Sequence, residues 1–213
     1  MKVVWLLIFL FATLSAFSMT TQEIQDTASK LLKISGKWSN LIALSSDLNG
    51  DGIKDIALIN ESLAPVAEGD AAPRMLVIIL LDKDNKAVYT TYSQYAILLA
   101  NEGGMMGDPL QDMEVMSNCL VLRFFGGSRE KWSQNYVFQY IKDGFYLIAL
   151  TTMVFDSYDG SEEWKEYDFV KRGLVVTKVS PKSKKNSVIQ NLSQKELLNL
   201  KDFVASDFDP KIN

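Results

Sequence analysis

The sequence predicts a mainly β protein with a β-rich α+β fold, in which antiparallel sheets are built from consecutive hairpins and one helix lies near each end. Three observations support this prediction. Apolar segments of strand composition fill the middle of the chain, their connections are too short for crossover helices, and helical spacing of apolar residues occurs near both ends. The predicted strands are 41–44, 56–59, 75–81, 87–92, 119–125, 136–141, 145–154, 164–170 and 174–179.

The connections between these strands determine how the strands pair. Segments 82–86, 142–144 and 171–173 are short and have the composition of hairpin turns. Strands that follow each other through so few residues must be antiparallel. Within the segment 136–141, alternation places Tyr136, Phe138 and Tyr140 on one side of the strand.

A first helix is predicted over residues 20–34. Thr20 and Glu23 have the spacing of a capping box. The apolar residues that follow, at positions i, i+4, i+7 and i+8, form one helical face, and they are Ile24, Ala28, Leu31 and Leu32.

A last helix is predicted from about residue 194 to residue 205. Ser193 and Glu196 repeat the capping pattern, and Leu197, Leu200 and Val204 continue it on one face. A dense basic run precedes this segment and is interpreted as a solvated loop. Its residues are Lys178, Lys182, Lys184 and Lys185.

Residues 1–18 have the layout of a secretory signal peptide. Lys2 is followed by an apolar run, and the small residues Ala16 and Ser18 fit the positions before a cleavage site. An uncleaved anchor is the alternative, but the run is shorter than the roughly 20 apolar residues that a bilayer needs. We therefore expect a periplasmic or secreted protein, a single β-rich domain over residues 19–213, that does not insert into a membrane after cleavage.

Composition excludes several classes of function. The chain of 213 residues contains no histidine, which removes Ser-His-Asp and Cys-His catalysis and imidazole-based metal sites. Without Lys2, 21 basic residues stand against 26 acidic ones, a net charge of −5 that argues against a nucleic-acid partner. A single cysteine, Cys119, rules out an intramolecular disulfide.

The segment 47–55 is the motif with the clearest chemistry. Asp47, Asn49, Asp51 and Asp55 place oxygen-bearing side chains at loop positions 1, 3, 5 and 9, with glycine at position 6. Calcium prefers six to eight oxygen ligands, and such a loop supplies them at alternate positions. The residue at position 12 is Leu58 where an EF-hand has Glu, and the flanking segments are predicted strands, so an EF-hand fits poorly.

This segment resembles the strand-loop-strand calcium motif of FG-GAP and VCBS-type repeats, which occur in secreted bacterial proteins. The resemblance implies side-chain ligands at Asp47, Asn49, Asp51 and Asp55 and a backbone carbonyl ligand at Ile53. Only one copy of the motif is present, so we expect a single calcium-braced hairpin rather than a propeller. The alternative is a metal-free turn, because Asp, Asn and Gly also form turns without an ion.

Two glycine-rich turns, 102–109 and 124–129, form a second candidate binding site, for which the sequence signal is weaker. They bring Glu102 and Asp108 into the same region as Arg129 and Trp132, a mixture that suits a pocket for a sugar or a peptide. The alternative interpretation places the glycines at hairpin ends, Arg129 in a surface ion pair and Trp132 against a sheet.

Two hypotheses for function follow. The first is an exported, calcium-binding, non-enzymatic β domain that acts as a binding or envelope-associated module for an unidentified protein or glycan. The second is a histidine-free hydrolase of extracellular glycans. Its acid and base would be drawn from Glu102, Asp108, Asp112 and Glu114. That chemistry requires two carboxyl groups about 5–5.5 Å or about 6.5–9.5 Å apart across a cleft.

Overall fold

We describe residues 20–32, 37–181, 183–193 and 196–210 of a computed structural model of the chain. This part contains one α-helix, eleven strands in two antiparallel sheets, and two short 3₁₀ helices. The mainly β prediction is therefore confirmed. The predicted signal peptide, residues 1–18, lies outside the described residues. No helix in the described part is long and apolar enough to span a membrane.

The small sheet has four strands in the order β1-β2-β3-β4, so each strand pairs with its neighbour in sequence. The strands are β1 (Trp38–Ser46), β2 (Asp55–Ser62), β3 (Arg74–Leu81) and β4 (Ala87–Ser93). Every residue of β3 is buried, because the sheet is covered on one face by the helix and on the other by the second sheet.

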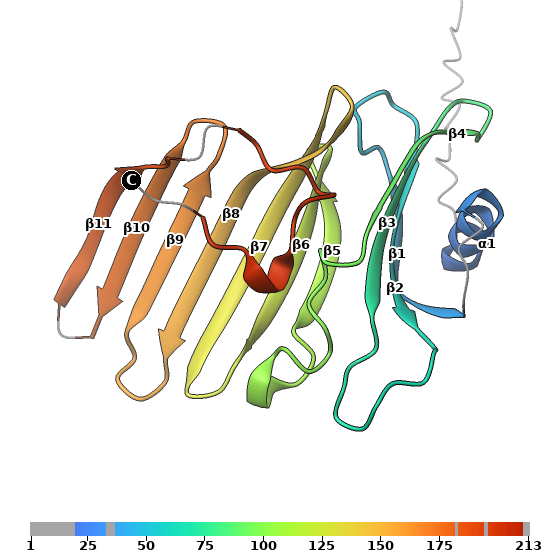
Figure 1. Cartoon of the computed structure of the whole chain (residues 1–213). Helices are drawn as coiled ribbons and strands as arrows, with labels where there is room; N and C mark the ends of the chain where they lie inside the picture. Colours follow the sequence, from blue (N-terminus) through green and yellow to red (C-terminus); the bar gives the residue numbers. More distant parts are fainter. Residues whose placement is uncertain (1–19, 33–36, 182, 194–195, 211–213) are drawn as a thin grey trace, which may run out of the picture.

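The large sheet has seven strands in the order β11-β10-β9-β8-β7-β6-β5, again a simple meander (Figure 1). The strands are β5 (Leu110–Met116), β6 (Cys119–Gly127), β7 (Glu130–Ile141), β8 (Gly144–Asp156), β9 (Glu162–Asp168), β10 (Gly173–Ser180) and β11 (Ser183–Asn191). The predicted turns at 82–86, 142–144 and 171–173 all connect paired neighbours, which confirms the antiparallel arrangement.

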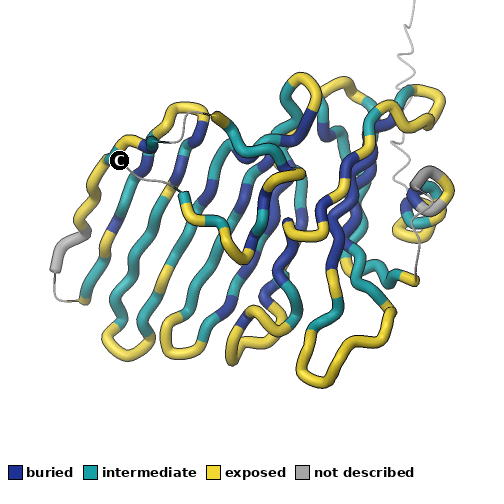
Figure 2. Tube along the Cα trace, in the orientation of Figure 1, coloured by how far each residue is buried: buried dark blue, intermediate teal, exposed yellow. Residues whose placement is uncertain are grey.

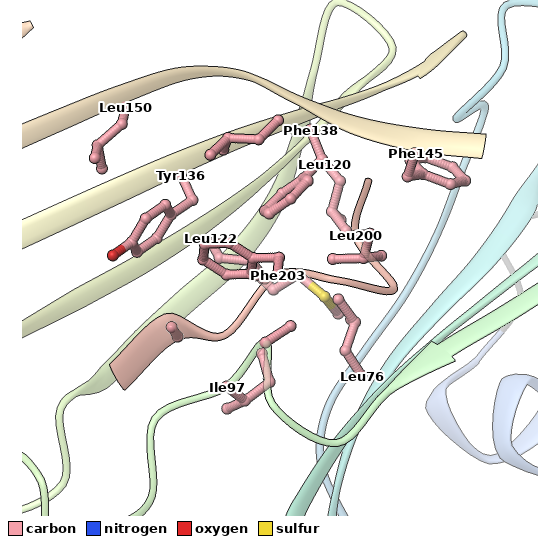
Figure 3. Close-up of a cluster of buried hydrophobic side chains, with 14 of the residues drawn as sticks. Leu76, Ile97, Leu120, Leu122, Tyr136, Phe138, Phe145, Leu150, Leu200 and Phe203 are labelled. Atoms are coloured by element: carbon pink, nitrogen blue, oxygen red, sulfur yellow. The ribbon is translucent and has the colours of Figure 1, made fainter. Parts of the chain in front are cut away.

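The main core lies between the two sheets. Tyr136 and Phe138 are fully buried there, and Tyr140 packs against the same cluster, so the predicted shared face is confirmed. Figure 3 shows Phe203 between the rings of Tyr136 and Phe138 on the large sheet and Leu76 of the small sheet. Burial is concentrated where the small sheet faces the large one and decreases toward β11 (Figure 2).

Helix α1 (Thr21–Leu32) begins where the sequence predicts, and residues 33–34 lie outside the described part. The capping box is formed: the Thr20 N–H donates to Glu23 Oε2 at 2.7 Å and the Glu23 N–H donates to Thr20 Oγ1 at 3.3 Å. Ile24 and Ala28 are buried against the outer face of the small sheet. A second, smaller core therefore stabilises this helix, as expected for an amphipathic segment.

The predicted helix at 194–205 is wrong for the residues described, 196–205. This segment lies in extended and turn conformation, and the only helical piece nearby is the short η2 (Ala205–Asp207). The Leu147 N–H donates to the Leu198 carbonyl at 2.9 Å, and the Leu200 N–H donates to the Phe145 carbonyl at 2.8 Å. The segment thus pairs with the part of β8 that β9 does not reach, and this tertiary pairing outweighs the local helical pattern.

Strands β5 and β11 were not predicted. In β5 the apolar residues alternate with Asp112 and Glu114. The segment is therefore too polar to stand out as a strand in the sequence. The basic run interpreted as a loop contributes Lys178 to β10 and Lys184 and Lys185 to β11. The loop interpretation is therefore wrong at these three positions. β11 is the edge strand of its sheet, and an edge strand tolerates lysine. β10 is paired on both sides, and Lys178 there forms an ion pair with Glu163 of β9.

Candidate functional site

The loop 47–55 joins β1 to β2, and its side chains hold its backbone in shape. The Asp47 carboxylate accepts hydrogen bonds from the N–H groups of Gly50 at 2.6 Å and Gly52 at 2.9 Å. Both glycines have positive φ, 82° and 84°, a conformation that other residues adopt only with strain. The glycines at these positions let the chain reverse tightly around the first predicted ligand.

Asn49 and Asp51 continue this arrangement. The Asp51 N–H donates to Asn49 Oδ1 at 3.0 Å, and the Asn49 amide donates to Asp51 Oδ2 at 2.9 Å. The Ile53 N–H donates to Asp51 Oδ1 at 2.7 Å. The structure therefore brings four of the five predicted ligand residues, those from 47 to 53, into one tight loop.

Asp55 lies at the base of the loop and is fully buried. Its Oδ2 accepts the Leu48 N–H at 2.8 Å, and its Oδ1 accepts the Leu81 N–H at 2.9 Å, which ties the loop to the end of β3. Burial is the largest influence and raises the pKa of Asp55. The charges of Asp51 and Asp47 raise this pKa further, while the two backbone hydrogen bonds oppose the shift.

The loop also touches the large sheet. The Leu48 side chain is fully buried in the core between the sheets. The Asn118 amide, in the turn between β5 and β6, donates to the Asp47 carbonyl at 2.9 Å. Anything that stiffens this loop therefore acts on the junction of the two sheets.

The donor chemistry of the loop fits calcium, since all the predicted ligands are oxygen atoms. Each side-chain oxygen that accepts one loop hydrogen bond keeps a second lone pair. However, no group of three or more His, Cys, Asp and Glu side chains in the described part is gathered in a way that could hold a metal ion. An ion at this loop would therefore require its oxygens to turn toward a common centre.

The two glycine-rich turns do lie against each other. The Gly127 N–H donates to the Gly103 carbonyl at 2.9 Å. A Cβ atom at Gly126 would stand 2.5 Å from the Trp132 ring and 2.9 Å from the Cα atom of Gly103. Trp132 therefore packs closely on a glycine of β6, which agrees with the alternative interpretation of this tryptophan.

Arg129 lies in the turn between β6 and β7 and forms an exposed ion pair. Its guanidinium donates to both carboxylate oxygens of Asp156, at 3.1 Å and 2.6 Å, and stands 4.9 Å from the centre of the Tyr158 ring. The hydrogen bonds from Arg129 are the largest influence on Asp156 and lower its pKa. This geometry matches the alternative interpretation, a surface ion pair.

Asp108 contacts a residue that the sequence reasoning missed. Arg74, at the start of β3, is 1% exposed. Its Nη1 donates to Asp108 Oδ1 at 2.8 Å and its Nη2 donates to Asp108 Oδ2 at 2.5 Å. The Arg74 Nε donates a hydrogen bond to Glu61 Oε2, and Nη1 also donates to the Leu98 carbonyl, each at 2.9 Å. The sequence signal that could have identified Arg74 is its position directly before the apolar run 75–81.

The four carboxylates considered for hydrolysis are all engaged by neighbours. The Asp108 pKa is lowered mainly by its hydrogen bonds with Arg74, which is the wrong direction for a general acid. Glu114 is paired with Arg123, and Asp112 accepts the Met113 N–H at 2.8 Å. Glu102 accepts the Leu99 N–H through Oε2. This geometry gives the hydrolase hypothesis no support.

A pocket of about 320 Å³ lies beside the small sheet. Its lining includes Glu102 but not the other predicted pocket residues, Asp108, Arg129 and Trp132. The residues that line it are Pro73, Gln94, Tyr95, Ile97, Leu99, Glu102 and Ser206. Tyr95 and Ser206 come from parts of the chain that gave no functional signal in the sequence.

Comparison of the chain with models of known protein families, with curated proteins and with solved structures found no match. The resemblance of the loop 47–55 to FG-GAP and VCBS-type motifs therefore stays a prediction.

Proposed function

We propose that this protein is an exported, calcium-binding β module that works by binding a protein or a glycan, without catalysis. The calcium ion would be held in the loop 47–55 by the side chains of Asp47, Asn49, Asp51 and Asp55 and by the carbonyl of Ile53. The support for export is the N-terminal segment 1–18, whose sequence has the layout of a secretory signal.

The observation that carries the calcium proposal is the excess negative charge of the loop 47–55, which has three aspartates against one lysine, Lys54. Asp47 and Asp51 are close enough to Asp55 to raise its pKa, and Asp55 itself is fully buried. None of the ion pairs found in the described residues involves any of these three carboxylates. A divalent cation would balance this charge, and calcium accepts an irregular set of oxygen ligands.

A calcium ion at this position would have a structural effect. The loop is attached to β3 through Asp55, to the core through Leu48 and to the large sheet through Asn118. Binding would therefore stiffen the junction of the two sheets. This role supplies rigidity to a binding module and requires no reacting group.

The test is thermal unfolding of the mature protein during a calcium titration. An ion that binds only the folded loop stabilises it by about 2.7 kcal/mol when free calcium is about 100 times the dissociation constant. Extracellular modules bind calcium at about 0.1–1 mM, so the titration must reach tens of millimolar. Magnesium should have a smaller effect, because it requires strict octahedral geometry and retains its waters.

Substitution of Asp51 makes the test specific. Asp51→Asn keeps an oxygen that accepts the Ile53 N–H but removes the charge, so the folded state without calcium should persist. Most of the calcium-dependent rise in melting temperature should disappear. Asp84→Asn, in the Asp-rich turn between β3 and β4, is the matched control and should respond like the unaltered protein. An equal response of Asp51→Asn and Asp84→Asn would refute the proposal.

A further inference from the structure

The pocket beside the small sheet lies at the end opposite to the calcium loop. Asp55 starts β2 at the loop end, whereas Pro73 lies where β2 finishes, since its carbonyl accepts the Ser62 N–H at 2.9 Å. The remaining lining residues come from the segment 94–102, which follows β4, and from η2. The pocket and the calcium loop are therefore separate sites.

The walls of the pocket are fixed in place by the surrounding structure. The Ala205 N–H donates to the Tyr95 carbonyl at 2.8 Å, which joins η2 to the segment after β4. Ser93 Oγ accepts the N–H groups of Tyr95 and Ala96 at 3.2 Å and 3.1 Å. Arg74 holds the same segment through the Leu98 carbonyl. A ligand would thus meet a preformed site, which lowers the entropic cost of binding.

The lining combines apolar walls with one charged group. Pro73, Ile97 and Leu99 supply aliphatic surface, and the Tyr95 side chain is 64% exposed. Glu102 is the only charged residue in the lining. One of its carboxylate oxygens accepts the Leu99 N–H, which fixes the group and leaves the other oxygen for a ligand.

No cation of the protein balances Glu102 in the described part of the chain, since none of the ion pairs found there includes it. A carboxylate and an exposed aromatic residue in the lining of one pocket favour a positively charged ligand, through a charge-assisted hydrogen bond and through a cation–π contact. The volume of about 320 Å³ is at the lower end of the range for ligand sites, so it suits one side chain or one sugar unit.

We propose that this pocket binds a primary ammonium group, with Glu102 as its counter-ion and Tyr95 as its aromatic wall. The group is supplied by a lysine side chain of a partner protein, because the aliphatic walls of Pro73, Ile97 and Leu99 suit the apolar stem that carries the ammonium group. This inference rests on the proposed function as a binding module, but it does not depend on calcium.

The experiment uses two-dimensional amide NMR spectra of the mature protein with four probes. Nα-acetyl-lysine amide and glucosamine carry the ammonium group, and Nα-acetyl-norleucine amide and N-acetylglucosamine are their uncharged counterparts. At millimolar concentrations, Nα-acetyl-lysine amide should shift the amide signals of the lining residues, and Nα-acetyl-norleucine amide should not. Binding of glucosamine but not of Nα-acetyl-lysine amide would reject lysine as the occupant and assign the ammonium group to a glycan. Equal effects of charged and uncharged probes, or no effect of any, would overturn the proposal.

Two variants test the assigned roles. Glu102→Gln keeps an acceptor for the Leu99 N–H and should weaken ammonium binding by about tenfold or more, because a charged hydrogen bond becomes neutral. Glu130→Gln, an exposed carboxylate at the start of β7, is the control and should bind normally. Tyr95→Leu changes an exposed ring and should also weaken binding. Unchanged affinity in both Glu102→Gln and Tyr95→Leu would assign any ammonium binding to a different site.

Each titration is run with calcium and with a chelator. Ammonium binding without a calcium response would uphold the pocket and reject the metal site. A calcium response without ammonium binding would reject the pocket and leave the metal site standing.

Discussion

Arg74 and Asp55 are the only charged side chains buried in the described residues, and the protein accommodates them differently. Arg74 starts β3 and Asp55 starts β2, at opposite ends of one strand pair. The Arg74 charge is balanced by two carboxylates, those of Glu61 and Asp108. The Asp55 charge meets only the neutral N–H groups of Leu48 and Leu81. In the described residues Asp55 thus forms no ion pair, whereas Arg74 forms two, and under the proposed function calcium would balance the Asp55 charge.

The largest effect is expected from Asp55→Ala. This change leaves the buried N–H groups of Leu48 and Leu81 without an acceptor, and each such group costs about 1–3 kcal/mol. The free energy of unfolding should fall by about 4 kcal/mol in denaturant titrations without calcium. A loss below about 1 kcal/mol would show that the loop does not need Asp55 to stay attached to β3.

Arg74→Met should cost slightly less, about 3 kcal/mol, since it removes four hydrogen bonds but leaves carboxylates that water still reaches. Arg74→Lys should recover little of this loss, because an ammonium group cannot reproduce the planar fork that Asp108 binds. Chemical unfolding of both variants checks this expectation. Full recovery by lysine would reduce the role of Arg74 to that of a point charge.

The stability of the protein at low pH should depend on the ion pair between Arg74 and Asp108. Its hydrogen bonds with Asp108 lower the Asp108 pKa below the ordinary value of 3.8. A carboxylate with a lowered pKa in the folded state stabilises the protein above its unfolded pKa, and this stability is lost as the pH falls through the folded value. Asp108→Asn should therefore flatten the decline in melting temperature below about pH 4. The Asp108 side chain is 46% exposed, so the difference should be small.

The smallest effect is expected from Arg129→Met. The bond between Arg129 and Asp156 is also bidentate, through Nε and Nη2 where Arg74 uses Nη1 and Nη2, but the Arg129 side chain is 64% exposed. Exposed ion pairs contribute at most about 1 kcal/mol, so the unfolding free energy should change by less than that. If Arg129→Met destabilised the protein as much as Arg74→Met, burial would not be what separates the two arginines.

The sequence predicted most strands because their side chains alternate or are uniformly apolar. Nine strands were located in this way, and the turns between neighbours fixed their antiparallel pairing. Strand β11 was missed because its lysines have the composition of a solvated loop. The predicted last helix failed because Leu200 and Phe203 are buried by contacts with distant strands, and a single sequence does not show such contacts.

The candidate sites were predictable to different degrees. The loop 47–55 is local in sequence, so its ligand residues could be named and the structure gathers most of them in one loop. The pocket around Glu102 and the Arg74 cluster combine residues from segments far apart in the chain. The sequence does not show why an arginine stands at the start of the apolar strand β3. The reason appears only in the complete fold, where the Arg74 side chain is buried.

The C-terminal segment that replaces the expected helix has a consequence for folding order. Residues 198–203 follow every strand in the sequence, yet Leu200 and Phe203 fill the space between the two sheets (Figure 3). Each hairpin can form early, because its partners are neighbours along the chain. Closure of the core requires the most distant contacts, and loop-closure entropy makes those contacts slow to form. Folding should therefore finish with this segment, and until it docks the two sheets expose the apolar faces they later share.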